Sequence, residues 1–191
     1  PSVRVMPGRY SFNVYTEFNG NVNKIGSKFF EVERIRTGVL INPNLDQIEA
    51  FLVDLEKTYK NYSVVNHKFS KIKRSNKSVP SLISKTSNYK SYVENYNQIK
   101  EMINMIDVFV SGNKSKKDIM EKDTETISDR LSVAVRGVNS SYGPTTMQIS
   151  SLNKAKSLIT EFDNMLKELS LEFNKLKNQL EGELESLILD W

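Results

Sequence analysis

The spacing of apolar residues along the chain changes once, near residue 40. In residues 9–18 (RYSFNVYTEF) one parity carries Tyr10, Phe12, Val14 and Phe18, and the other is mostly polar. A period of two is typical of a β-strand with one buried face. From residue 45 onward apolar residues recur at alternating spacings of three and four, which is the period of helices that pack along one stripe.

The strand-like part predicts a β-hairpin. Asn19-Gly20 follows the first strand, and both residue types tolerate the positive φ angles of a two-residue hairpin turn. A second strand is expected over about residues 25–35, where Gly26 indicates a β-bulge. A lone two-stranded hairpin is only marginally stable in water. We therefore expect this one to pack on the helices and to be the last hairpin of a truncated fibronectin-like sandwich.

The helical part predicts four segments. The first covers about residues 44–75, after an Asn-Pro-Asn helix-start signal; Asn66 interrupts its seam and Val65 takes that place after a small rotation. The second covers about residues 89–110 and ends at a Ser-Gly-Asn stop signal. A third, shorter helix is expected over residues 118–138.

The last helix has the clearest pattern. Thr145 and Gln148 form a capping box that starts it, and the 3–4 spacing of apolar residues then holds for about four heptads. At about 1.5 Å per residue this helix would exceed roughly 50 Å. Beyond Gly182 the seam shifts, and we expect its last part to be a seam for a partner helix. The residues of this candidate seam are Leu180, Leu184, Leu187 and Trp191.

Together the elements predict a mainly α fold: an elongated antiparallel bundle of about four long helices, preceded by a β-hairpin. Residues 1–38 are assigned to the hairpin and residues 39–191 to the bundle. The chain starts at Pro1 within strand-like sequence and stops at Trp191 within an apolar pattern. We therefore expect it to be a piece of a longer protein.

Composition narrows the function classes. A net charge of +4 with charges of both signs interspersed indicates a soluble surface and disfavours nucleic acid as a partner. The absence of cysteine excludes disulfides and cysteine-based zinc sites, and it is compatible with an oxidising compartment. No apolar run approaches the roughly 18 residues of a membrane span. Arg4 and Arg9 argue against a signal peptide.

Candidate catalytic chemistry is sparse. His67 is the single histidine and lacks the motifs that accompany a triad or a metal site, so we interpret it as a surface residue. Glu181, Glu183 and Glu185 diverge on one helix and are interpreted as a charged face rather than as paired hydrolytic carboxylates. The acidic residues near 118–125 and the basic residues near 71–77 and 114–117 fit solvated helix ends. No catalytic residue, cofactor or metal is expected.

A set of five tyrosines is the most distinctive surface feature. If the first two helices pair antiparallel, these side chains would cluster, and aromatic faces can stack on sugars or line a groove for a partner. The alternative is a half-buried core whose hydroxyl groups reach water. The residues of this candidate partner or glycan surface are Tyr59, Tyr62, Tyr89, Tyr92 and Tyr96.

Three short motifs carry a resemblance to a known family. Pro7-Gly8-x-Tyr10 enters the first strand, Phe30-Glu31-Val32 ends the hairpin, and Gly143-Pro144-Thr145 opens the final helix. In this order the chain resembles the C-terminal region of large bacterial sortilin-type (VPS10-like) β-propeller proteins, also called BNR-repeat glycosyl hydrolases. They are common in Bacteroidetes, which the Lys-, Asn- and Ile-rich composition suits. The resemblance implies that propeller activity lies upstream, and it transfers no catalytic residue.

These observations lead to three hypotheses of function. The first is a non-catalytic structural or interaction module, the C-terminal accessory domain of a larger secreted or periplasmic β-propeller protein. The alternative is a helical subunit that binds a partner in a bacterial envelope assembly, such as a secretion or motility machine. The third, part of a glycoside hydrolase, depends on the resemblance alone. The expected partner is the upstream propeller or another envelope protein.

Overall fold

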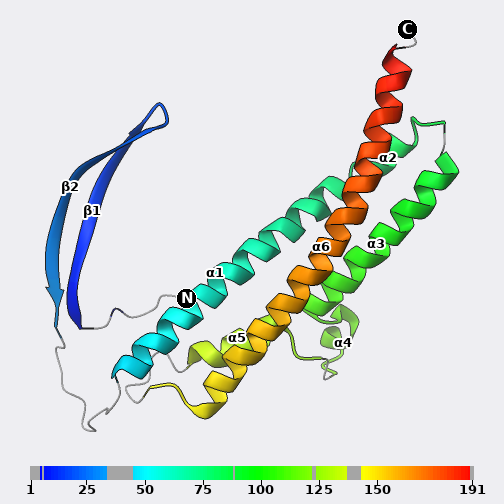
Figure 1. Cartoon of the computed structure of the whole chain (residues 1–191). Coiled ribbons are helices and arrows are strands. Elements are labelled where there is room, and N and C mark those ends of the chain that lie inside the picture. Colours follow the sequence, from blue (N-terminus) through cyan, green and yellow to red (C-terminus); the bar gives the residue numbers. More distant parts are fainter. Residues whose placement is uncertain are drawn as a thin grey trace.

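The computed structural model describes Val5 and residues 7–33, 45–87, 89–121, 124–136 and 143–189. The chain is mainly helical, with an antiparallel β-hairpin before the helices (Figure 1). The elements are β1 (Gly8–Phe18), β2 (Asn21–Val32), α1 (Leu45–Asn76), α2 (Val79–Ile83), α3 (Tyr89–Ser111), α4 (Lys114–Asp118), α5 (Ile127–Arg136) and α6 (Thr146–Leu189). The predicted fold class is confirmed.

The hairpin has the predicted turn and bulge. Asn19 and Gly20 adopt φ angles of 50° and 78°, so that Phe18 pairs directly with Asn21. The pairing shifts by one residue between Val14 and Tyr15, next to Gly26 on the partner strand. The second strand begins at Asn21, not near residue 25 as predicted, because a two-residue turn lets pairing start at once. The predicted end near residue 35 lies outside the described residues.

The first two long helices end where the sequence predicted. α1 stops at Asn76, and Val65 is buried in its seam while Asn66 stays half-exposed. α3 stops at Ser111, where Gly112 adopts a φ of 76° and donates its N–H to the carbonyl of Val108 at 2.8 Å. A glycine reaches this left-handed conformation without strain and closes the helix.

The third predicted helix is wrong in its first half. The structure has a short α4 and a separate α5 instead of one helix over residues 118–138. Met120, within the predicted helix, is 95% exposed and has a φ of 57°, which is incompatible with a continuing helix. α5 starts only after Thr126, which accepts the N–H of Asp129 while Asp129 accepts the N–H of Thr126. This reciprocal cap sets the helix start.

The last helix begins at the predicted capping box. The N–H of Thr145 donates to Oε1 of Gln148 at 2.7 Å, and the N–H of Gln148 donates to Oγ1 of Thr145 at 3.3 Å. Gly143 precedes the cap with a φ of 81°, and a Cβ atom there would lie 3.1 Å from Cγ1 of Ile48. The entry to α6 therefore packs closely on α1.

The bundle is held together around α6. α3 runs antiparallel to α1 and α6, whereas α1 and α6 run in the same direction, because the chain returns through α4 and α5 before α6 begins (Figure 1). An ion pair between Lys156 and Asp54 and an edge-to-face contact between Phe162 and Phe69, 5.7 Å between ring centroids, join α6 to α1. The core follows the predicted seams of all three long helices.

Candidate functional site

The predicted tyrosine set is mostly half-buried. Tyr59 and Tyr62 of α1, and Tyr92 and Tyr96 of α3, pack against the bundle core, whereas Tyr89 is 54% exposed. Burial raises the pKa of Tyr59 and of Tyr62, since desolvation disfavours the phenolate. These side chains therefore contribute apolar packing to the bundle.

Tyr92 belongs to a polar contact between α3 and α6. The pKa of Tyr92 is raised mainly by a hydrogen bond between its hydroxyl and the Glu183 carboxylate, and to a lesser extent by burial. Oε1 of Glu183 also accepts the backbone N–H of Ser87 at 2.7 Å and the Ser87 hydroxyl at 2.5 Å. The carboxylate thus fastens the chain just before α3 to α6. The sequence interpretation of Glu183 as part of a solvated charged face is incomplete, because spacing on one helix does not reveal contacts between helices.

The five tyrosines fall into two separate groups. Asp54 lies beside Lys156, and α1 and α6 run parallel from that level. Tyr62 lies about 8 residues beyond Asp54, whereas Glu183, next to Tyr92, lies about 27 residues beyond Lys156. At about 1.5 Å per residue the difference is roughly 28 Å along the bundle, and it is roughly 42 Å when the Phe69–Phe162 contact is taken as the common level. The structure therefore does not bring the tyrosines of α1 and α3 together in one surface.

The predicted partner seam begins inside the bundle. Leu180 is 2% exposed and is part of the core, so this chain's own helices already cover it. Leu184 and Leu187 lie in the helical backbone of α6, but their side chains are outside the described part of the chain, as is Trp191. The described residues therefore support a long α6 and leave the seam beyond Leu180 as a prediction.

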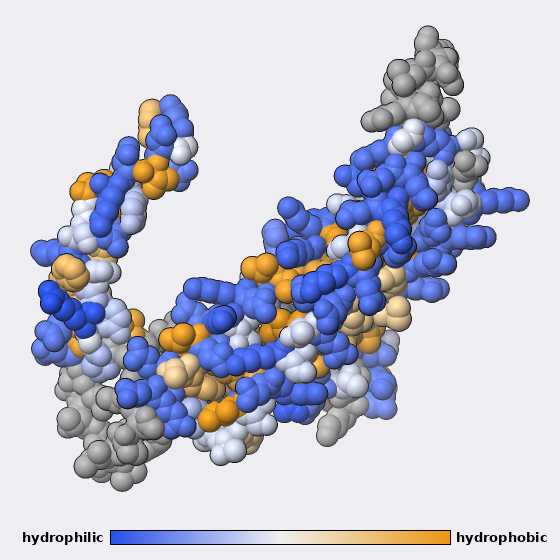
Figure 2. All heavy atoms as spheres, viewed as in Figure 1, coloured by the Kyte–Doolittle hydropathy of each residue, from blue (hydrophilic) through white to orange (hydrophobic). Residues whose placement is uncertain are grey.

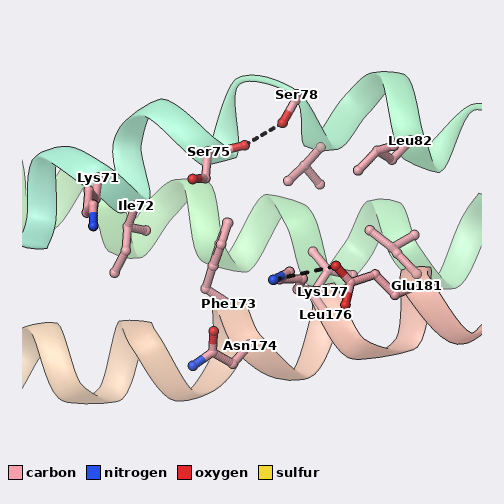
Figure 3. A pocket seen from close by; sticks show the side chains of 12 residues that line it. Lys71, Ile72, Ser75, Ser78, Leu82, Phe173, Asn174, Leu176, Lys177 and Glu181 are labelled. Carbon is pink, nitrogen blue, oxygen red and sulfur yellow. Dashed lines mark hydrogen bonds and ion pairs between the residues drawn. The ribbon is translucent and has the colours of Figure 1, made fainter. Parts of the chain in front are cut away.

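A groove of about 400 Å³ lies between the end of α1, α2 and α6 (Figure 3). Phe173 and Leu176 of α6 and Ile72 of α1 line its apolar part, and Figure 3 shows Phe173 pointing toward α1. Lys177 and Glu181 at its rim form an exposed ion pair with an N–O distance of 3.5 Å. The groove suits an apolar side chain, and its lining contains no nucleophile paired with a base.

The other candidate groups have structural partners or face water. His67 is exposed. Among the basic residues near the end of α1, Lys73 pairs with Asp107 of α3 at 2.7 Å and lies over the ring of Phe69. Within the described ranges, no group of three His, Asp or Glu side chains is placed to hold a metal ion. None of the helices in that part of the chain has the length and apolarity needed to cross a bilayer.

The described part of the hairpin carries several exposed apolar side chains. Tyr10, Phe12, Val14 and Phe30 share one side of the paired strands with Lys28, which lies directly opposite Phe12, and we call this side the hairpin face. The ring of Phe30 stacks on Tyr10 at 5.9 Å and lies 6.2 Å from that of Phe12. Phe12, Val14 and Phe30 remain 50%, 44% and 46% exposed. The sequence predicted this face correctly but expected it to be buried.

Figures 1 and 2 show the hairpin standing apart from the helices with hydrophobic residues at its surface. Comparisons with family models, with curated proteins and with solved structures found no match to this chain. The candidate interaction surface is therefore defined by geometry alone, and it is the hairpin face.

Proposed function

We propose that this chain is a non-catalytic interaction module, the C-terminal accessory part of a larger secreted or periplasmic β-propeller protein. The observation that carries the proposal is the exposed hairpin face. Burying apolar surface contributes about 25 cal/mol per Å², and a two-stranded hairpin in water forgoes most of that gain. A hairpin with exposed aromatic residues is therefore expected to pack against further β structure.

The helical bundle fits the same role. It has its own continuous core along α1, α3 and α6, so it is suited to act as a rigid support for the hairpin. Two of its charged groups, Glu183 and Lys73, make contacts between segments of the bundle. The motifs at Pro7-Gly8, Phe30-Glu31 and Gly143-Pro144 resemble those near the end of sortilin-like propeller proteins and support this parent.

The extent of the native protein tests the proposal. We would purify it from its source and determine its boundaries by intact mass and peptide mapping. We expect residues 1–191 to form the end of a much longer chain with a β-propeller upstream. A native chain that begins close to Pro1 would refute the propeller parent.

A direct test of the non-catalytic role uses the 191-residue chain alone. Incubated with chromogenic α- and β-glycosides, it should release no more product than a heat-unfolded sample of the same chain. Turnover that disappears on unfolding would refute the proposal and revive a hydrolase role.

A second candidate is a helical subunit of an envelope assembly, and the length of α6 favours it. α6 has 44 residues against 32 for α1 and 23 for α3, and its last turns extend beyond α3 in Figure 1. A helix that outruns its neighbours offers a surface for a partner helix. Analytical ultracentrifugation separates the candidates, because this one predicts assembly through the end of α6 that truncation after Gly182 abolishes.

A further inference from the structure

The turn of the hairpin joins a side-chain amide to a main-chain nitrogen that no side chain of its own residue shields. Asn19-Gly20 is the single Asn-Gly pair in the sequence. Both residues are exposed, and their φ angles of 50° and 78° lie in the left-handed region. A Cβ atom added at Gly20 would meet nothing within 4 Å, so the space around this residue is open.

The strand pairing leaves the nitrogen of Gly20 outside the ladder. In a two-residue turn the hydrogen bond joins the residues before and after the turn, and here Phe18 and Asn21 pair directly. The ladder therefore does not need the N–H of Gly20. Because glycine has no Cβ, this nitrogen is open to the side chain of Asn19, which precedes it.

We propose that Asn19 is a site of spontaneous deamidation, with water as the co-reactant. Hydroxide removes the proton from the N–H of Gly20, and this nitrogen attacks Cγ of Asn19. A C–N bond forms and closes a five-membered imide. The bond between Cγ and the side-chain nitrogen breaks, and that nitrogen takes up a proton from water and leaves as ammonia. Water then opens the ring at Cγ, which gives aspartate, or at the main-chain carbonyl carbon, which gives β-linked isoaspartate.

Three other asparagines of the hairpin are matched internal controls. Asn13, Asn21 and Asn23 are equally exposed, but they lie within the paired strands. Each is followed by a residue whose side chain crowds the attacking nitrogen, and a β-branched side chain crowds it most. The residues that follow them are Val14, Val22 and Lys24. Deamidation is therefore expected at the turn and not along the strands.

Opening of the hairpin sets the rate of this reaction. The ring closes only after the peptide plane between Asn19 and Gly20 rotates out of the turn conformation, which disturbs the neighbouring pair of Phe18 and Asn21. A lone two-stranded hairpin is only marginally stable in water, so such openings are frequent. We expect Asn19 in the folded chain to convert no more than about tenfold more slowly than in the chain unfolded in guanidinium chloride.

The two products have different effects on the hairpin. Aspartate keeps the length of the main chain, and Asp-Gly also favours a two-residue turn. β-linked isoaspartate places the side-chain carbon in the main chain, so that the turn gains one atom and Phe18 no longer meets Asn21 in register. The β-linked product therefore loosens the hairpin face. The inference does not depend on the proposed parent, because the chemistry needs only these two residues and water.

The experiment is incubation of the 191-residue chain in mildly alkaline buffer, followed by peptide mapping with electron-transfer fragmentation. We expect residue 19 to gain about 1 Da, in two separable products, at a rate proportional to the hydroxide concentration. Asn13, Asn21 and Asn23 should stay unchanged over the same period. Asn19→Gly leaves a Gly-Gly pair that keeps the turn, and it should abolish the change.

Amide hydrogen exchange of the separated products tests the effect on the hairpin. The N–H of Asn21 should lose its protection in the β-linked product and keep it in the aspartate product.

Three results would overturn the inference. The first is conversion of Asn19 more than about tenfold slower in the folded chain than in denaturant, which would mean that the hairpin seldom opens. The second is conversion of Asn13, Asn21 or Asn23 as fast as that of Asn19, which would deny the turn a special role. The third is equal exchange of the Asn21 amide in the two products, which would mean that the register tolerates the extra atom.

Discussion

Replacing Phe162 with alanine tests the central packing of the bundle. The Phe162 ring has no exposed surface, and it meets Phe69 edge to face with an interplanar angle of 87°. Truncating a fully buried phenylalanine costs about 3–5 kcal/mol, through lost burial and the cavity that remains. We expect the higher part of this range, because the ring is fully buried and its edge-to-face contact with Phe69 joins two helices.

The assay is equilibrium unfolding in urea, followed by far-ultraviolet circular dichroism, with Leu171→Ala as the control. Leu171 lies on the same helix and is 63% exposed, so its truncation should change the free energy of unfolding by no more than about 0.5 kcal/mol. A loss of less than about 1 kcal/mol for Phe162→Ala would refute the central position of this ring. Comparable losses in both variants would mean that α6 is rotated about its axis relative to the core described above.

Three further predictions concern the tyrosines, the α3–α6 contact and the hairpin. Burial raises the pKa of Tyr62 above 10.0, so its stabilising contribution is present below that pH and is lost as the pH rises through the folded-state pKa. Tyr62→Phe should therefore reduce the fall in melting temperature at alkaline pH. An unchanged pH profile of the melting temperature would contradict this reasoning. Glu183→Ala should lower the free energy of unfolding by about 1–3 kcal/mol and return the pKa of Tyr92 toward its ordinary value. The control, Glu181→Ala, removes only an exposed ion pair and should lower the free energy of unfolding by less than about 0.5 kcal/mol. Equal losses in the two variants would argue against the contact between Glu183 and Ser87. Removing residues 1–38 should leave the urea unfolding of the helices unchanged within about 0.5 kcal/mol, and a larger loss would show that the hairpin packs on the bundle.

Local rules accounted for most of the secondary structure. The Asn19-Gly20 turn, the bulge beside Gly26, the stop at Gly112 and the Thr145 cap are as predicted, because each depends on residues close together in the chain. The start of α5 was missed although its signal was present: Thr126 and Asp129 form a reciprocal cap, and the apolar spacing upstream outweighed it in the sequence interpretation.

The positions of the candidate site residues relative to one another depend on contacts between distant segments, which the sequence does not reveal. The tyrosines had two interpretations, a clustered surface or a half-buried core, and four of them pack against the core, with those of α1 and α3 apart along the bundle. The contacts Lys73–Asp107 and Ser87–Glu183 join the helices at this offset. Leu180 was expected to face a partner, but it is covered within the bundle.

The spacing of apolar residues, the turn residues and the helix caps thus determined whether each segment forms a strand, a turn or a helix, because these effects act over a few residues. The tertiary structure alone decided which helices run in parallel, which carboxylate joins two helices and which apolar face remains open, because all three depend on contacts between segments far apart in the chain. The hairpin shows the difference most clearly. Its alternating pattern specified an apolar face, and only the three-dimensional arrangement of the described residues shows that Phe12, Val14 and Phe30 of this face are about half exposed.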